Sequence, residues 1–354
     1  MKVITKYISK QILSVFFLCS SIFVLLYLVI DFVQRIDNFA RADVPLPLIL
    51  LYFLYKIPTM AMEVIPAATM ISIVVVICQM KKNKEIMAMK ACGLNLHKVF
   101  LPVITISIII YTFSLFFSEM VVPYTSTRSN EIKESGGKKK SQASFQEWYK
   151  SKNNIYWIRH FDIETKTISD PVFYFFDDQF KLLKKISGKS CKWLGGEWEL
   201  EDAEILTLEK DSFYHTEKQQ HYALEIPETP DTFISKMRKP ADMSYGELRK
   251  HSLKLKAQGY DNTSDRVNLY MKLSYPFMSV VFALIAIPLG LWEKINGIPL
   301  SVTFGMLTMF LLFVVMGAAK ALGLAGTLPP LLSAWTANVL FSFTGIYFLM
   351  NIKK

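Results

Sequence analysis

The chain has 354 residues, of which 52% are hydrophobic and 20% are charged, and its formal net charge is +10. So many apolar residues exclude a disordered chain, and their long uninterrupted runs argue against an ordinary soluble protein. Residues 124–266 hold 24 basic and 23 acidic residues, so nearly all of the positive excess lies beside the apolar runs. This placement is typical of membrane flanks and argues against a nucleic-acid partner.

Six apolar runs are each long enough to cross a bilayer, which takes about 20 residues. They cover residues 12–33, 57–80, 99–122, 267–292, 299–322 and 331–352. Within lipid every backbone amide must be paired inside its own segment, so we expect these runs to be helices. The first run is too long for the apolar part of a signal peptide and lacks a small-x-small cleavage site, which predicts a retained anchor.

Prolines mark the entry to the second span. Pro45 and Pro47 precede an apolar run, and Pro58 and Pro66 interrupt the stretch after it. Because proline removes a helical hydrogen bond, we expect a short interfacial helix that leads into a kinked span. A single long tilted helix is the alternative.

Lysines and arginines in the short loops predict the orientation of the spans. One side carries Lys2, Lys6, Lys10, Lys81, Lys82, Lys84, Lys90, Lys98, Lys294, Lys353 and Lys354. Outside the long insert, the opposite side carries only Arg35, Arg41, Lys56 and Lys320. The richer side is expected to face the cytoplasm, with both termini, so the insert is expected to lie in the periplasm of a bacterial cell.

The insert reads mostly as β structure. Aromatic and β-branched runs at 155–158, 172–176, 198–208 and 222–226 are separated by turn residues, a spacing typical of a sandwich or barrel. Residues 243–258 instead suggest a helix that ends at Gly259.

The predicted fold class is therefore an α-helical integral membrane protein with six transmembrane helices and an inserted all-β periplasmic domain. We assign residues 1–123 to the first three spans, 124–266 to the β domain and 267–354 to the last three spans.

Signatures of catalysis are missing from the sequence. It has no G-x-S-x-G and no H-E-x-x-H motif, and Gly188-Lys189-Ser190 lacks the upstream glycine of a phosphate loop. The five histidines show no paired metal spacing, and the four cysteines form no disulfide framework. We expect a non-catalytic chain that binds no metal or cofactor itself and depends on another protein for energy.

The longest inner connection, residues 81–98, predicts a short helix at about 83–94. Asn83 can cap its start, Glu85 suits the positive helix end, and Gly93 fits the stop. If Ile86, Met87 and Met89 are exposed beyond the bilayer, they could insert into a groove on a cytoplasmic partner. The alternative is an amphipathic helix that rests on lipid.

The chain resembles a known family through nearly its whole length. The stretches that carry the resemblance are residues 83–93 (NKEIMAMKACG), 118–123 (SEMVVP), 237–240 (MRKP), 243–249 (MSYGELR), 272–277 (KLSYPF), 287–290 (IPLG) and 328–335 (LPPLLSAW). Each is loose by itself, but their order is specific. Together they are similar to the lipopolysaccharide-export permeases LptF and LptG, and general similarity favours the LptG-like member. One departure is Ala337, where the family often has proline before Asn338.

The resemblance implies a permease subunit of an ATP-driven transporter that extracts lipopolysaccharide from the bacterial inner membrane and passes it to a periplasmic jellyroll bridge protein. It implies a periplasmic β-jellyroll, a paralogous permease as heterodimer partner and a cytoplasmic ATPase dimer that uses the ATP. It also makes the inner loop a coupling helix, in which Glu85 is expected to contact the ATPase. The candidate coupling residues are Glu85, Ile86, Met87, Met89, Lys90 and Gly93.

Four basic residues map to the depth of outer-leaflet phosphates and are candidates for binding the lipid head group: Arg35, Lys56, Lys272 and Lys320. The alternatives are internal pairing with Asp31, Glu63 and Glu119, or plain interfacial anchoring. Other functions that the sequence leaves open are a membrane signalling receptor or scaffold with a periplasmic ligand-binding domain, and an ATP-driven permease for another lipid or lipoprotein.

Overall fold

The computed structural model divides the chain into two compact units. It describes residues 2–41, 44–94, 96–135, 143–150, 154–162, 165–177, 179–208, 214–224, 226, 228–230, 240, 242–257, 261–292 and 297–351. The helical unit comprises Met1–Ile132, Pro240–Ser252 and Asn262–Lys354, and the β unit comprises Lys133–Lys239 and Leu253–Asp261. The helical unit thus includes residues 124–132, 240–252 and 262–266, which the sequence interpretation had assigned to the β domain.

The helical unit confirms the six predicted spans. The described helices are α1 (Lys2–Arg41), α2 (Leu46–Lys82), α3 (Glu85–Ala91), α4 (Leu96–Met120), α5 (Val122–Ser135), α7 (Tyr245–Ala257), α8 (Thr263–Leu291), α9 (Ile298–Leu324) and α10 (Pro330–Met350). The last residues of α5 and α7 belong to the β unit, and the other helical residues belong to the helical unit. Among the described helices, α1, α2, α4, α8, α9 and α10 are long and apolar enough to cross a membrane.

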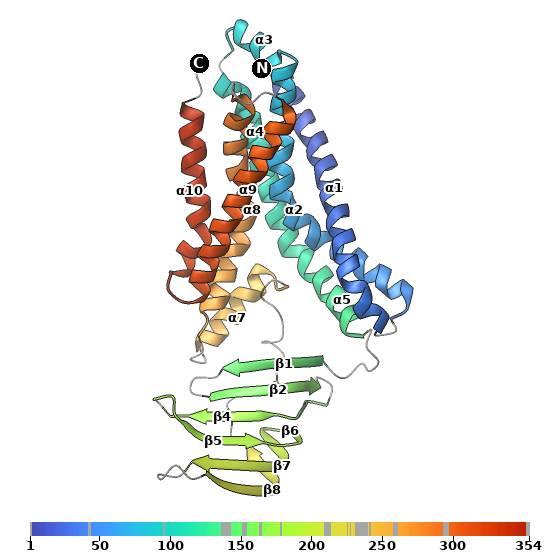
Figure 1. Cartoon of the computed structure of the whole chain (residues 1–354), viewed down its shortest axis with the longest axis vertical. Coiled ribbons are helices and arrows are strands. Elements are labelled where there is room, and N and C mark those ends of the chain that lie inside the picture. Colours follow the sequence, from blue (N-terminus) through green and yellow to red (C-terminus); the bar gives the residue numbers. More distant parts are fainter. Residues whose placement is uncertain are drawn as a thin grey trace. The chain divides into compact units, whose positions relative to one another are not determined.

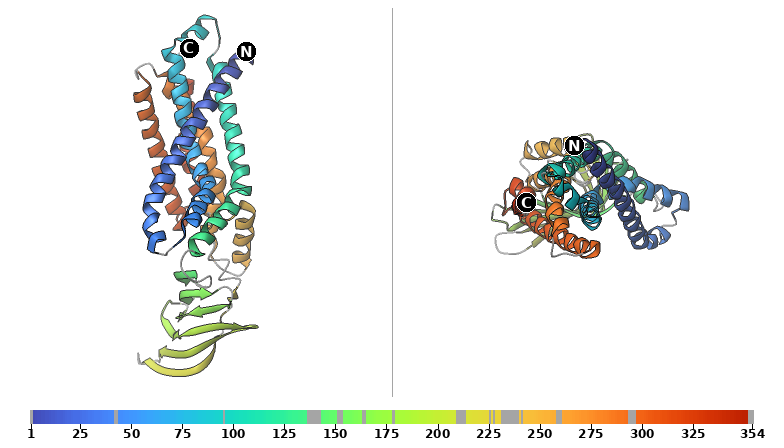
Figure 2. Two further views of the ribbon diagram at one scale, coloured as in Figure 1. Left: turned by 90° about the vertical axis from the view of Figure 1, so that its right-hand side faces the viewer. Right: turned by 90° about the horizontal axis from the view of Figure 1, so that it is seen from above.

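The two ends of the helical unit differ in what they carry. Both chain termini lie near α3 at one end, and α5 and the first turns of α7 lie at the other (Figure 1, Figure 2). We refer to them as the α3 end and the α7 end.

Helix α8 packs against α2 at the centre of the spans. In their most apolar stretches, 72% of the residues of α8 and 67% of those of α2 are buried, compared with 11% for α1 and 17% for α9. Gly290 permits the close approach, because a Cβ there would lie 2.8 Å from Cγ2 of Ile77. On the other side of α8, the amide of Asn338 in α10 donates to the carbonyl oxygen of Ser274 at 2.8 Å.

Helix α2 corrects the expectation of two segments. It is one continuous helix with Pro58 and Pro66 inside it. A proline within a membrane helix leaves carbonyl groups that neighbouring helices can satisfy. The hydroxyl of Tyr275 in α8 donates to the carbonyl oxygen of Glu63 at 2.8 Å, within one turn of Pro66. The structure therefore has the single long helix that was the alternative, with a contact from α8 close to its second internal proline.

The β unit confirms the inserted β domain. Its strands are β1 (Ala143–Lys150), β2 (Asn154–Asp162), β3 (Thr167–Ser169), β4 (Val172–Phe176), β5 (Leu182–Ser187), β6 (Ser190–Leu194), β7 (Glu197–Leu208) and β8 (Tyr214–Leu224). All pairs are antiparallel, in the order β1-β2-β3-β6-β7-β5-β4, with β8 on β7. An additional β2–β4 pairing closes the path into a ring.

The interior of the β unit is aromatic. Tyr156, Phe161, Phe173 and Trp198 are fully buried, and the indole nitrogen of Trp198 donates to the carbonyl oxygen of Glu228 at 2.7 Å. Cys191 is a free cysteine in this core, where burial raises the pKa of its thiol to about 12. The thiol therefore stays protonated and packs as a small apolar group.

The contact between α9 and α10 generates a test of the packing. Gly323 lies against Ser333, so a Cβ at position 323 would clash with that side chain and would lie 3.2 Å from Cγ2 of Val267. At Gly317, on the same helix, an added Cβ would meet no heavy atom within 4 Å. We expect Gly323→Ala to destabilise the purified full-length protein by about 1–3 kcal/mol through overpacking. Thermal denaturation in detergent measures this, with Gly317→Ala as the tolerated control; equal melting temperatures would contradict the close packing.

Candidate functional site

The helix α3 begins with a backbone conformation that the sequence did not predict. Lys84 precedes the helix with φ of 60°, in the left-handed region, and no side chain caps the start. Asn83 was predicted to be the cap; its amide instead donates to Oε1 of Glu85 at 3.1 Å. The hydroxyl of Tyr7 donates to Oε2 of the same carboxylate at 3.2 Å. Hydrogen bonds from Tyr7 and Asn83 therefore orient the carboxylate of Glu85 within the chain itself.

The end of α3 agrees with the prediction. Gly93 has φ of +73°. Its backbone amide donates to the carbonyl oxygen of Lys90, and the backbone amide of Leu94 donates to the carbonyl oxygen of Met89. This pair of bonds is the Schellman motif, which favours glycine at the left-handed position.

The exposed face of α3 is narrower than expected. Met87 is 68% exposed, but Ile86 is only 7% exposed and belongs to the core of the helical unit. Met89 packs against that core, and Lys90 is exposed. The expectation that Ile86 and Met89 are exposed beside Met87 is therefore wrong, because these two side chains anchor the short helix to the spans.

Two of the four head-group candidates share one buried carboxylate. Asp31 in α1 is 4% exposed, and its oxygens lie 2.8 Å from Nε of Arg35 and 2.6 Å from Nζ of Lys56 in α2. Lys56 also lies over the ring of Tyr52, 5.6 Å from its centroid. The cluster joins α1 to α2 and keeps a net charge of +1, so internal pairing accounts for one of its two cations.

The third candidate, Lys272, lies in a different cluster on α8. Its charge interacts with the carboxylates of Glu119, Asp242 and Glu247. Lys320 on α9 is half-buried and, within the described part of the chain, joins neither cluster. The four candidates therefore do not form one site. Arg35 and Lys56 share Asp31, Lys272 lies among carboxylates, and Lys320 lies outside both clusters.

Glu119 has a role that the sequence reasoning missed. Its oxygens accept hydrogen bonds from the amides of Tyr245 at 2.6 Å and Gly246 at 3.1 Å, in the first turn of α7. The backbone amide of Glu247 donates to the hydroxyl of Ser244 at 3.1 Å, and the backbone amide of Ser244 donates to the carboxylate of Glu247 at 3.0 Å. This reciprocal pair of hydrogen bonds is a capping box. The S-x-x-E spacing of 244–247 was a local signal for this helix start, but nothing local pointed to Glu119.

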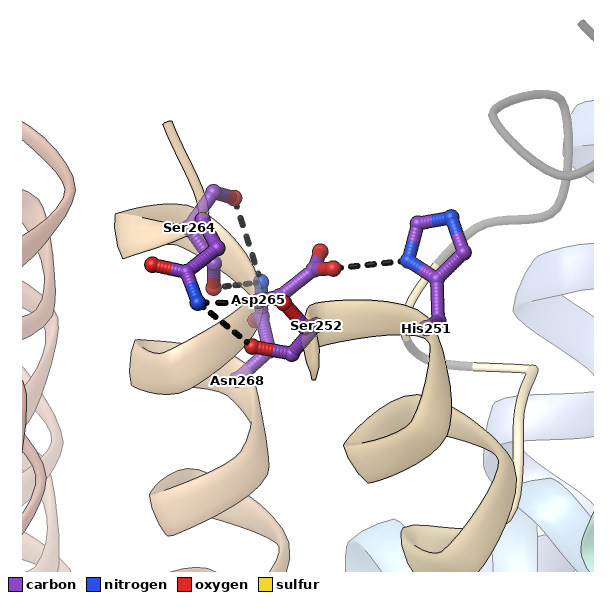
Figure 3. A network of polar contacts seen from close by, with 6 residues as sticks. His251, Ser252, Ser264, Asp265 and Asn268 are labelled. Atoms are coloured by element: carbon purple, nitrogen blue, oxygen red, sulfur yellow. Dashed lines mark hydrogen bonds and ion pairs between the residues drawn. The ribbon is translucent and has the colours of Figure 1, made fainter. Parts of the chain in front are cut away.

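A second set of contacts fastens α7 to α8. Nδ1 of His251 lies 2.7 Å from Oδ2 of Asp265, and both side chains are nearly buried (Figure 3). The amide of Asn262 donates to the carbonyl oxygen and hydroxyl of Ser252, both at 3.1 Å. At the turn before these contacts, Asp242 accepts hydrogen bonds from Ser126 and, at 3.0 Å, Asn130 of α5. The α7 end is thus a polar junction of α4, α5, α7 and α8.

Metal chemistry has no support from this geometry. Among the residues that the structure describes, no group of three His, Cys, Asp or Glu side chains could hold a metal ion.

Comparison with known proteins gives one family. The model of the family described as "Lipopolysaccharide export system permease LptF/LptG" matches residues 6–351, nearly the whole chain. It covers both kinds of permease and does not distinguish between them, so the preference for LptG stays a prediction. None of the curated proteins compared matches the chain. The family match favours a permease over a receptor or scaffold.

The contact between Glu119 and α7 can be tested by hydrogen exchange. Hydrogen bonds to a charged group contribute about 1.5–3 kcal/mol, so Glu119→Ala should speed exchange of the Tyr245 and Gly246 amides at least tenfold. Mass spectrometry of the full-length protein measures it. Glu131→Ala is the control, because Glu131 forms an exposed ion pair with Arg128 on α5. Unchanged exchange in Glu119→Ala would contradict the assigned role.

Proposed function

This chain belongs to the LptF/LptG family of lipopolysaccharide export system permeases, and we propose that it is the permease subunit of an ATP-driven transporter. In this proposal it takes lipopolysaccharide from the inner membrane and passes it to a periplasmic bridge protein on the way to the outer membrane. The observation that carries the proposal is the family match over residues 6–351, which includes all six spans and the β unit. A related permease completes the membrane part.

The orientation follows the positive-inside bias. Lys81, Lys82, Lys84 and Lys90 all lie on α3 or beside it, at the end that also holds both termini (Figure 1). We propose that this α3 end faces the cytoplasm and that the β unit lies in the periplasm.

The energy source is a separate ATPase in this proposal. The chain carries no recognised nucleotide motif, and α3 presents Met87 and Lys90 at the proposed cytoplasmic end. Glu85 lies at the first turn of α3 and is half-buried, with its carboxylate already oriented by Tyr7 and Asn83. We propose that this carboxylate pairs with a basic residue in a groove of a cytoplasmic ATPase dimer, which uses the ATP.

The chemistry of the cargo explains why a membrane path is needed. At about 0.8 kcal/mol per buried methylene, six acyl chains of about a dozen carbons would cost on the order of 60 kcal/mol to expose to water. Noncovalent binding supplies at most roughly 18–21 kcal/mol. The lipid must therefore move from the bilayer to an apolar surface without crossing water.

The head group of the lipid is anionic, and the proposal assigns it to cations near the α7 end. Asp31 already neutralises half of the charge of Arg35 and Lys56. Lys272 is half-buried in α8 beside three carboxylates that also hold α7 in place. A phosphate that bound Lys272 would compete with Glu119, which links head-group binding to the position of α7.

The docking role of Glu85 can be separated from its contacts within the chain. Removing one partner of a buried interfacial charge pair costs about 2 kcal/mol or more, so Glu85→Ala should weaken ATPase binding roughly thirtyfold or more and lower export. Tyr7→Phe is the matched control, since it removes one internal hydrogen bond and keeps the carboxylate. Co-purification and lipopolysaccharide release are the measurements. Wild-type export by Glu85→Ala, or an equal loss in both variants, would contradict docking through this carboxylate.

Binding of the head group by Lys272 is tested with one substitution that removes the positive charge and one that keeps it. We expect Lys272→Gln to lower the lipopolysaccharide retained by the purified complex and Lys272→Arg to restore it, because charge is the property required. Arg249→Gln, at an exposed position of α7, controls for a general loss of positive charge. If retained lipid is unchanged in Lys272→Gln at equal thermal stability, Lys272 does not bind the head group.

A further inference from the structure

A cavity at the α3 end has no part in the proposed path of the cargo. Its volume is about 960 Å³, within the range of ligand pockets. The end of α2, the helix α3 and the adjoining parts of α8, α9 and α10 line it. The Lys272 cluster lies on the other half of α8, beside α7, so the two places are separate sites of the helical unit.

One edge of the cavity is basic. Lys81, Lys84 and Lys90 line it, and the described lining residues include no aspartate or glutamate. The ammonium group of Lys81 donates to the carbonyl oxygen of Trp292 at 2.7 Å, which fixes one lysine at the edge. The lining therefore carries a formal charge of +3.

Away from the lysines the cavity is mostly apolar and is elongated. On α9, Phe304, Thr308 and Leu311 follow each other at helical spacing and so share one face. On α10 the lining extends from Asn351 at the helix end back to Phe341, which is about 15 Å along the axis at 1.5 Å per residue. The cavity is thus charged at the end of the bundle and apolar toward its middle.

This distribution matches an amphiphile with a negative head and a hydrocarbon tail. Phe304, Leu311 and Phe348 are 38%, 49% and 47% exposed, and they belong to α9 and α10, which are apolar enough to cross a membrane and mostly exposed in the described chain, so a lipid tail has a sideways path into the cavity. Basic pockets between transmembrane helices on the cytoplasmic side bind anionic lipid head groups. A soluble nucleotide or peptide would leave the apolar half of the cavity unfilled.

We infer that this cavity binds an anionic phospholipid of the adjoining leaflet, with its phosphate among Lys81, Lys84 and Lys90 and an acyl chain along Phe304, Leu311 and Phe341. Ile86 and Met87 of α3 also line the cavity, so the bound lipid contacts the short helix directly. The binding itself does not depend on whether α3 meets an ATPase. The lipid is a resident of the protein and distinct from exported cargo.

The test of the head group compares lysines that line the cavity with one that does not. The full-length chain, purified with its co-assembled partners, is placed in nanodiscs of phosphatidylcholine with a minority of phosphatidylglycerol, and bound lipid is measured by native mass spectrometry. Wild type should retain phosphatidylglycerol preferentially. A Lys84→Gln/Lys90→Gln double variant should bind it roughly thirtyfold more weakly, which corresponds to about 1 kcal/mol for each lysine.

Lys82→Gln is the matched control for charge. Lys82 is exposed at the end of α2 and does not line the cavity, so this variant should retain phosphatidylglycerol like wild type. Equal retention by the double variant and the control would overturn the inference. Equal retention of phosphatidylcholine and phosphatidylglycerol by wild type would overturn it as well.

The tail is tested by filling the cavity. Thr308 lines it and Thr303, earlier on α9, does not; both hydroxyls bond a carbonyl oxygen of their own helix. Thr308→Trp should abolish phosphatidylglycerol retention, and Thr303→Trp should leave it unchanged. A photo-crosslinking residue at position 308 should capture phospholipid. Capture of the related permease or the ATPase instead would show a protein occupant and overturn the inference, whatever the outcome for Glu85.

Discussion

The packing of α8 against α2 is the interaction on which the rest of the helical unit depends. Both helices are buried over most of their apolar length, and Gly290 lets their backbones approach so closely that Ile77 fills the space of a side chain. In lipid the hydrophobic effect contributes little to helix association, so close van der Waals contact at small residues provides much of the stabilisation. The other spans attach to this pair, and α1, α9 and α10 keep most of their surface free for lipid or a partner.

Two clusters of charged side chains within the described spans share their charge. Asp31 lies between two cations, and Lys272 interacts with three carboxylates. A single unpaired charge inside a membrane span is costly. A cluster whose positive and negative charges do not balance keeps a net charge that can attract or repel a charged ligand. The two clusters differ in sign, since the first keeps a net positive charge and the second a net negative one. An anion would therefore be attracted to the first cluster and would have to compete with carboxylates for Lys272 at the second.

The sequence predicted what depends on neighbouring residues. Apolar length gave the six spans, aromatic and β-branched runs between turn residues gave the strands β2, β4, β7 and part of β8, and a glycine gave the end of α3. It missed what depends on residues far apart along the chain. Glu119 accepts a hydrogen bond from the amide of Tyr245 across 126 positions, and Tyr275 donates to the carbonyl oxygen of Glu63 in α2 across 212. Ile86 looked exposed because a seven-residue helix cannot reveal which side faces a core built by other helices.

The left-handed turn at Lys84 has a practical consequence. This conformation costs a lysine roughly 1–2 kcal/mol that glycine would not incur. A screen for heat-resistant variants in detergent would accordingly reward glycine at position 84, and the hardier protein would have lost a charge from the rim of the cavity. Selection for thermostability at this position would therefore favour a residue that carries no charge, at the expense of one of the three lysines that line the cavity.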